Sequence, residues 1–127
     1  MHLNMSGEKP IFLQFAEELE DNILKGIFEE ETQIPSTTEV AVKFKINPAT
    51  ANRGVNLLVD EDIIYKKRGI GMFVKIGARE KITAKRKNAF YESYILSLVE
   101  EAKNLNITQG EIIAMLERGC QNEHNRD

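Results

Sequence analysis

The chain has 127 residues, of which 42% are hydrophobic and 29% charged, values ordinary for a soluble globular protein. This length predicts one domain, or a small domain with an appended module. No apolar run approaches the roughly 20 residues needed to span a bilayer, and the polar start from Met1 to Pro10 does not resemble a signal peptide. Cys120 is the single cysteine, so no intrachain disulfide can form and a reducing, cytoplasmic location is expected.

The net charge of -3 at first argues against nucleic acid as a partner, but the charges are unevenly distributed. The segment from Glu8 to Gln33 carries eight acidic and two basic residues, for a net charge of -6. The segment from Ile34 to Lys75 carries seven basic and four acidic residues, for a net charge of +3. A basic face on an acidic body can still engage phosphates, because the local field steers binding.

An amphipathic helix is predicted from Ile11 to a stop near Gly26, because apolar residues recur at steps of three and four. Its apolar stripe comprises Phe12, Phe15, Ala16, Leu19 and Ile23. Its opposite face carries acids that we expect to be solvated and turned away from DNA: Glu17, Glu18, Glu20 and Asp21.

Two capped helices are predicted next. Ser36 with Glu39 is a capping-box pattern that opens a short helix from Thr37 to Phe44. Asn47 is a suitable N-cap, and Pro48 stands at the first helical position of a second helix that continues to about Glu61. Three residues join the helices, and Ile46 among them should fill the core between the two. This spacing is typical of a helix-turn-helix.

A β-hairpin should follow, because two β-rich runs, Ile63 to Lys67 and Met72 to Ile76, flank the sequence Arg-Gly-Ile-Gly at 68–71. Lys66, Lys67 and Arg68 place three positive charges at its tip. A basic hairpin directly after a helix-turn-helix is the pattern of a wing.

The C-terminal third reads as a separate helical module. One long helix is predicted from Arg79 to Leu105, and Thr108 with Glu111 forms a second capping box, opening a helix that stops near Gly119. The predicted domains are therefore a winged helix-turn-helix over 10–76 and a two-helix module over 79–119, with flexible tails at 1–9 and 120–127. The apolar face of the module contains Tyr91, Tyr94, Ile95, Leu98, Val99, Ala102 and Leu105.

Residues 10–75 resemble the N-terminal domain of the GntR family of bacterial transcription regulators, and the short helical C-terminus resembles its YtrA subfamily. The resembling segments are PIFLQFAEELEDNILKG, QIPSTTEVA and INPATANRGVNLLVDEDIIYKKRGIGMFV. The resemblance implies a mostly α fold with a small β wing, and a repressor that binds a palindromic operator as a dimer. Members of the family often carry arginine where this chain has Thr38 and Pro48, and glycine where it has Asp62.

The resemblance also implies that Ser36 caps the second helix and contacts phosphate, that Thr50 and Arg53 meet DNA, and that Gly69 enters the minor groove. From the residues themselves, Asn52 could pair with adenine, and Arg53 with guanine or a phosphate. The alternative is that Asn52 and Asn56 are solvated surface and that the wing cations only aid solubility. The full set of candidate DNA contacts is Ser36, Thr37, Thr38, Lys45, Ala49, Thr50, Asn52, Arg53, Asn56, Lys66, Lys67, Arg68 and Gly69.

We predict a homodimer, because one small winged domain leaves few partners for the apolar face of the module. Tyr91 and Tyr94 are candidates for lining a site for an unidentified small-molecule effector between subunits, although such aromatic stripes usually belong to a core. The sequence offers no catalytic set, cofactor motif or metal site, since His2 and His124 lie in the predicted tails. The rival hypothesis is a winged-helix protein-interaction module without sequence-specific DNA binding.

Overall fold

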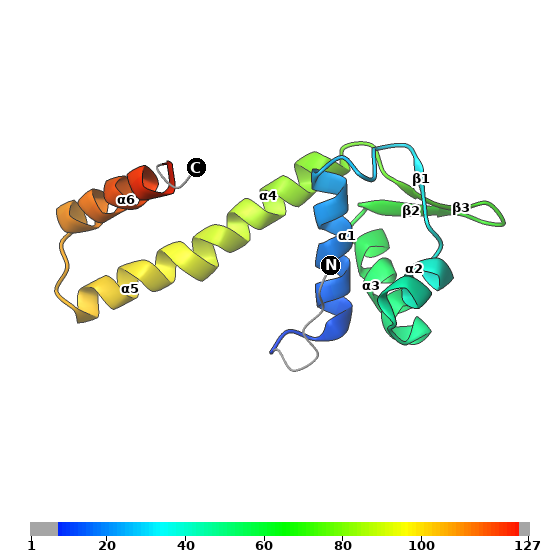
Figure 1. Cartoon of the computed structure of the whole chain (residues 1–127), viewed down its shortest axis with the longest axis horizontal. Helices are drawn as coiled ribbons and strands as arrows, with labels where there is room; N and C mark the ends of the chain where they lie inside the picture. The colour runs from blue at the N-terminus through cyan, green and yellow to red at the C-terminus, as the bar shows by residue number, and fades with distance from the viewer. Residues whose placement is uncertain (1–7, 125–127) are drawn as a thin grey trace. The chain divides into compact units, whose positions relative to one another are not determined.

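The structure, a computed structural model, describes residues 8–124 and divides into two compact units, with the boundary between Lys85 and Arg86 (Figure 1). The sequence predicts this boundary between 76 and 79. It lies later because the first two turns of the helix that begins at Ala78 pack into the first unit. Of the predicted tails, residues 1–7 and 125–127 lie outside the described residues, whereas residues 120–124 are helical. In the described part of the chain, no helix has the length and apolarity to cross a membrane.

Helix α1 (Ile11–Leu24) buries four residues of the predicted stripe, with Phe15, Leu19 and Ile23 at most 1% exposed and Ala16 at 2%, whereas Phe12 is half-buried. Each such side chain contributes about 1.5–3 kcal/mol to folding when it is fully buried. Pro10 stands at the N-cap, and its carbonyl accepts hydrogen bonds from the N–H groups of Leu13 and Gln14. The helix ends before Gly26, which has a φ of 81°.

The helix-turn-helix is formed by α2 (Thr37–Phe44) and α3 (Pro48–Asp60). Both predicted caps are present. Ser36 Oγ accepts from the Glu39 N–H at 3.1 Å, while the Ser36 N–H donates to Glu39 Oε1 at 3.2 Å. Asn47 Oδ1 accepts from the Ala49 N–H at 2.8 Å, with Pro48 as the first helical residue. Ile46 packs against the core from the turn, as predicted.

A three-stranded antiparallel sheet in the order β1-β3-β2 completes the first unit (Figure 1). The predicted hairpin is formed by β2 (Ile64–Lys67) and β3 (Gly71–Val74), with Tyr65 opposite Phe73. The third strand, β1 (Gln33–Ile34), is not among the elements that the sequence predicts. Its two residues pair with β3, so that Ile34 enters the core opposite Met72.

The expectation that Glu20 is solvated is wrong, since only 2% of this residue is exposed. Helix α4 (Ala78–Phe90) explains the burial. Ala78 and Ile82 are fully buried in the core of the first unit, and Lys85, one turn further along, forms ion pairs with Glu20 and with Glu61 at the end of α3. A buried carboxylate needs a counter-charge of this kind, because desolvation otherwise disfavours its ionised form.

The second unit continues α4 through a π-helical turn, η1 (Tyr91–Ile95), into α5 (Leu96–Asn104). The predicted long helix is therefore helical throughout but is interrupted by one wider turn. The second predicted capping box is present, because Thr108 Oγ1 accepts from the Glu111 N–H at 3.2 Å and the Thr108 N–H donates to Glu111 Oε1 at 3.1 Å. Helix α6 (Gln109–His124) passes the predicted stop near Gly119.

Candidate nucleic-acid interface

The exposed side of α3 carries the residues predicted to read bases. Ala49, Asn52, Arg53 and Asn56 are exposed, and Thr50 is half-buried. The other side of the helix packs into the core through Ala51, Gly54, Val55 and Leu58. The residues of this helix predicted to contact DNA therefore lie on its solvent-facing side, with Thr50 at the margin.

Arg53 lies at the edge of this surface, against α1. Its guanidinium carbon is 3.8 Å from the centroid of the Phe12 ring. The two helices approach closely beside this pair, since a Cβ atom added to Gly54 would lie 2.9 Å from the Phe12 carbonyl oxygen and 2.7 Å from the Phe15 ring. Phe12 was predicted only as a core residue. The sequence carries no local signal for its contact with Arg53, because the contact is tertiary.

The wing presents its cations on two sides. Lys66 lies opposite Met72 in the ladder and donates a hydrogen bond to Asn56 on α3 at 3.1 Å. Alternation along the strand turns Lys67 to the other side, where its ammonium lies 4.8 Å from the centre of the Phe73 ring. Arg68 and Gly69 at the tip are exposed, and Gly69 has a φ of 77°, which suits a residue without a Cβ atom.

A groove of about 350 Å³ runs between the start of α2 and the wing. It brings together Ser36 and Thr37 with Lys66, Lys67, Arg68 and Gly69, all predicted DNA contacts. The backbone N–H groups at a helix N-terminus and nearby cations both favour an anion. Thr38 and Lys45 do not line this groove, although both are exposed on the helix-turn-helix, and Lys45 occupies the left-handed C-cap of α2 with a φ of 54°.

The side chain of Gln33 contacts the loop of the wing, a role that the sequence does not predict. Its side-chain amide donates to the Ile70 carbonyl at 3.0 Å. The same amide nitrogen would lie 2.4 Å from a Cβ atom at Gly71, whose φ is 147°. Glycine at position 71 therefore permits both the strained backbone and the close approach of Gln33.

Asp62, which replaces the glycine expected from the resemblance, adopts a φ of 63° before the wing. Aspartate tolerates this left-handed conformation better than most residues. Its carboxylate also pairs with Lys81 at 2.7 Å and with Lys75 at 2.9 Å. Hydrogen bonds from Lys81 and then from Lys75 lower the pKa of Asp62 below its usual value. The base of the wing is thereby tied to α4.

Tyr65 and Glu31 form a second contact at the base of the wing. The Tyr65 hydroxyl donates to Glu31 Oε2 at 3.4 Å, and its ring stacks on Phe73 with centroids 5.5 Å apart. Desolvation, together with the neighbouring Glu31 carboxylate, raises the pKa of the Tyr65 phenol above 10. Tyr65 therefore stays neutral near pH 7 and acts in packing rather than as a charge.

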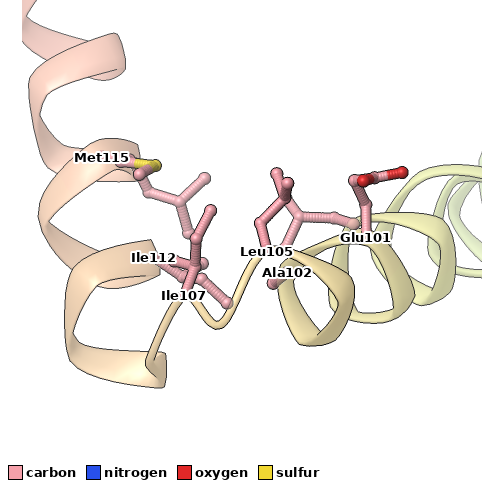
Figure 2. Close-up of a pocket in the computed structure, with 8 residues that line it drawn as sticks. Glu101, Ala102, Leu105, Ile107, Ile112 and Met115 are labelled. Atoms are coloured by element: carbon pink, nitrogen blue, oxygen red, sulfur yellow. The ribbon is translucent and has the colours of Figure 1, made fainter.

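The second unit has an apolar groove of about 290 Å³ between α5 and α6 (Figure 2). The view shows Ala102 of α5 and Leu105, which follows that helix, on one side, Ile112 and Met115 of α6 on the other, and Ile107 between the helices. Tyr91 and Tyr94 do not line the groove and are 52% and 65% exposed. Of the seven residues predicted for dimerisation, Ala102 is buried, Ile95 and Leu98 are half-buried, and the rest are exposed.

The capped helix pair, the exposed side of its second helix and the basic hairpin that follows define a winged helix-turn-helix. A family model described as "Bacterial regulatory proteins, gntR family" matches residues 13–74. The structure of a putative transcriptional regulator of the GntR family from Bacteroides thetaiotaomicron is 38% identical, with a TM-score of 0.79, over 90% of this chain and 99% of that one. The chain belongs to the gntR family.

Two other similarities bear on the site and on the subfamily. The AraR DNA-binding domain in complex with operator ORE1 is 25% identical, with a TM-score of 0.52, over 58% of this chain and 93% of that one. The transcriptional repressor YtrA of Bacillus subtilis is 28% identical over 79 residues, which are 62% of this chain and 61% of YtrA. The chain spans only 30% of the length of NagR, a B. subtilis transcriptional repressor to which it is 32% identical over 74 residues.

Proposed function

We propose that this protein is a sequence-specific DNA-binding repressor that places α3 in the major groove and its wing against the adjacent backbone. The observation that carries the proposal is the groove between α2 and the wing, which is lined by Ser36 and Thr37 at the start of α2 and by Lys66, Lys67 and Arg68 of the wing. Lys66 also contacts Asn56 on the exposed side of α3. The AraR DNA-binding domain, which is similar to this chain, is described in complex with an operator, and the relatives NagR and YtrA are described as repressors. A cytoplasmic location accords with this function.

Selection from a pool of random DNA duplexes tests sequence specificity and identifies the preferred site in the same experiment. We expect wild-type protein to enrich one motif and to bind it roughly 10³-fold or more tightly than a scrambled duplex of equal length. Enrichment of no motif, or equal affinity for both duplexes, would reject the proposal and favour the protein-interaction alternative. Placing the selected motif downstream of a reporter promoter then tests repression, and raised expression would argue against it.

We further propose that the second unit forms a homodimer by covering the groove between α5 and α6. Exposed apolar side chains gather beside this groove, including Leu105 at 61%, Leu116 at 52% and Met115 at 43% exposure. Among the described residues, Glu101 is the only charged one that lines the groove, and the volume of the groove is close to the lower end of the range for small-molecule sites. We therefore assign it to a second copy of the chain rather than to an effector. A dimer would place two recognition helices about 34 Å apart on a pseudo-palindromic site.

Sedimentation of a matched pair of variants tests the dimer. Leu105→Glu puts a charge on the apolar groove and should shift the protein to monomer, because a buried unpaired carboxylate is strongly disfavoured. Asn104→Glu adds the same charge at the neighbouring exposed position and should leave the dimer intact. Wild-type protein that sediments as a monomer at every concentration would overturn the proposal.

A further inference from the structure

The contact between Arg53 and Phe12 joins the surface of α3 to the first turn of α1. The guanidinium lies over the ring at 3.8 Å, Phe12 is half-buried and Arg53 is exposed. Over residues 8–124, the structure pairs Arg53 with no carboxylate and with no hydrogen-bond acceptor. Within the described residues, the charge of Arg53 is therefore not neutralised by an acid, and its N–H groups have no hydrogen-bond acceptor.

The geometry of a stacked arginine leaves its binding edges free. The five N–H donors of a guanidinium point outward in its plane, so a ring against one face blocks none of them. Stacking also removes much of the rotational freedom that a long side chain would otherwise lose on binding. An arginine held in this way is preorganised for a bidentate contact with guanine or a phosphate.

The surrounding backbone fixes where this stack can form. Gly54 follows Arg53 directly and is buried against α1, where an added Cβ atom would lie 2.9 Å from the carbonyl oxygen of Phe12 itself. The two residues of the pair are thus held beside a tight approach of the two helices. The backbone positions from which the two side chains extend are therefore set by the packing of α1 against α3.

We infer that Phe12 is a positioning residue for DNA recognition, because it holds the Arg53 guanidinium in the orientation that contacts DNA. The inference rests on the proposed function and extends it to α1, which belongs to neither the helix-turn-helix nor the wing. The aromatic ring is the property that matters, so tyrosine should replace phenylalanine and leucine should not.

A double-mutant cycle on the duplex selected by wild-type protein tests this inference. Phe12→Leu should weaken binding roughly 2- to 5-fold, the range expected for an exposed cation–π contact. The same substitution should have no effect in an Arg53→Ala background, whereas Phe12→Tyr should keep wild-type affinity. Phe28→Leu, which changes another half-buried phenylalanine packed on the core, controls for loss of stability.

The outcomes are distinct from those of the proposed function. If wild-type protein selects no duplex, the proposed function itself fails. If it selects one, but Phe12→Leu binds with unchanged or higher affinity, or loses as much affinity in the Arg53→Ala background as in the wild-type background, the positioning role is rejected. Urea unfolding of each variant shows whether the affinity changes follow folding instead, which would equally reject it.

Discussion

Lys66 on the wing donates a hydrogen bond to Asn56 on α3, with Nζ and Oδ1 3.1 Å apart. The pair joins the two elements proposed to contact DNA, and both residues are exposed. One partner carries charge and the other does not, so their contributions to DNA binding can be separated by salt.

Lys66→Ala should reduce the slope of log affinity against log salt concentration by about 0.9, because one fewer phosphate is neutralised. Asn56→Ala should leave this slope unchanged and instead reduce discrimination between the selected and scrambled duplexes, by about 1–3 kcal/mol if the amide contacts a base. Fluorescence anisotropy titrations at several salt concentrations measure both quantities. An unchanged slope for Lys66→Ala would show that this lysine does not contact phosphate.

Gly54→Ala should destabilise the first unit, because the new Cβ atom would meet Phe15 at 2.7 Å and the Phe12 carbonyl oxygen at 2.9 Å. Overpacking costs about 1–3 kcal/mol, whereas alanine gains only about 1 kcal/mol in helix propensity, so we expect a net loss of up to about 2 kcal/mol. The urea midpoint reports the change. Gly119→Ala is the matched control, since nothing lies within 4 Å of its added Cβ atom, and it should be neutral or stabilising.

Lys85→Met should destabilise the fold by about 1–3 kcal/mol, because it removes an ion-pair partner of the buried Glu20 carboxylate. The value stays below that of a fully buried pair because the Lys85 side chain is 41% exposed. Lys87→Met, an exposed lysine on the same helix, should change stability much less. Urea unfolding of the two variants beside wild type measures the difference, and equal losses would contradict the role of Lys85.

The same lysine predicts a pH dependence at the alkaline end. Burial by itself would lower the pKa of Lys85, but hydrogen bonds and charge interactions with Glu20 and Glu61 outweigh this and raise it above 10.5. A raised pKa means that the stabilisation is complete below pH 10.5 and is lost as the pH rises through the folded-state value. Wild-type stability should therefore fall in that range more steeply than that of Lys85→Met. Parallel curves would contradict this assignment.

Asp62 predicts the opposite dependence at the acid end. Its pKa is lowered from 3.8 by Lys81 and Lys75, so its contribution is present above pH 3.8 and is lost as the pH falls through the folded-state value. Asp62→Asn keeps a side chain that tolerates the left-handed conformation but cannot ionise. Thermal unfolding of this variant should show a flatter acid limb than wild type, whereas Asp60→Asn, at an exposed position, should retain the wild-type shape.

Much of the first unit was predictable because its signals are local. Helix starts are indicated within four residues by Ser36 with Glu39 and by Asn47 with Pro48. The glycines at 69 and 71 indicate a hairpin between two β-rich runs. Each motif satisfies or replaces backbone groups of its own segment, so it specifies structure wherever the segment lies.

The features that escaped prediction depend on partners distant in the sequence. Glu20 belongs to the same acidic pattern as Glu17, which is exposed, and its burial depends on α4, which brings Lys85 against it. Strand β1 is two residues long, which is too short for any periodicity in the sequence. It forms because its backbone pairs with the edge of β3. The spacing of apolar residues predicts Phe12 as a core residue, and only the tertiary structure reveals its contact with Arg53.

The π-helical turn from Tyr91 to Ile95 has an evolutionary implication. Such a turn closes its hydrogen bonds over five residues instead of four, so it accommodates one residue more than the α-helix around it. A homologue lacking that residue could keep an uninterrupted α-helix. An alignment of such chains should then open a single-position gap in the middle of a helix, a place where gaps are otherwise rare, and the gap would mark the site of an ancestral insertion or deletion.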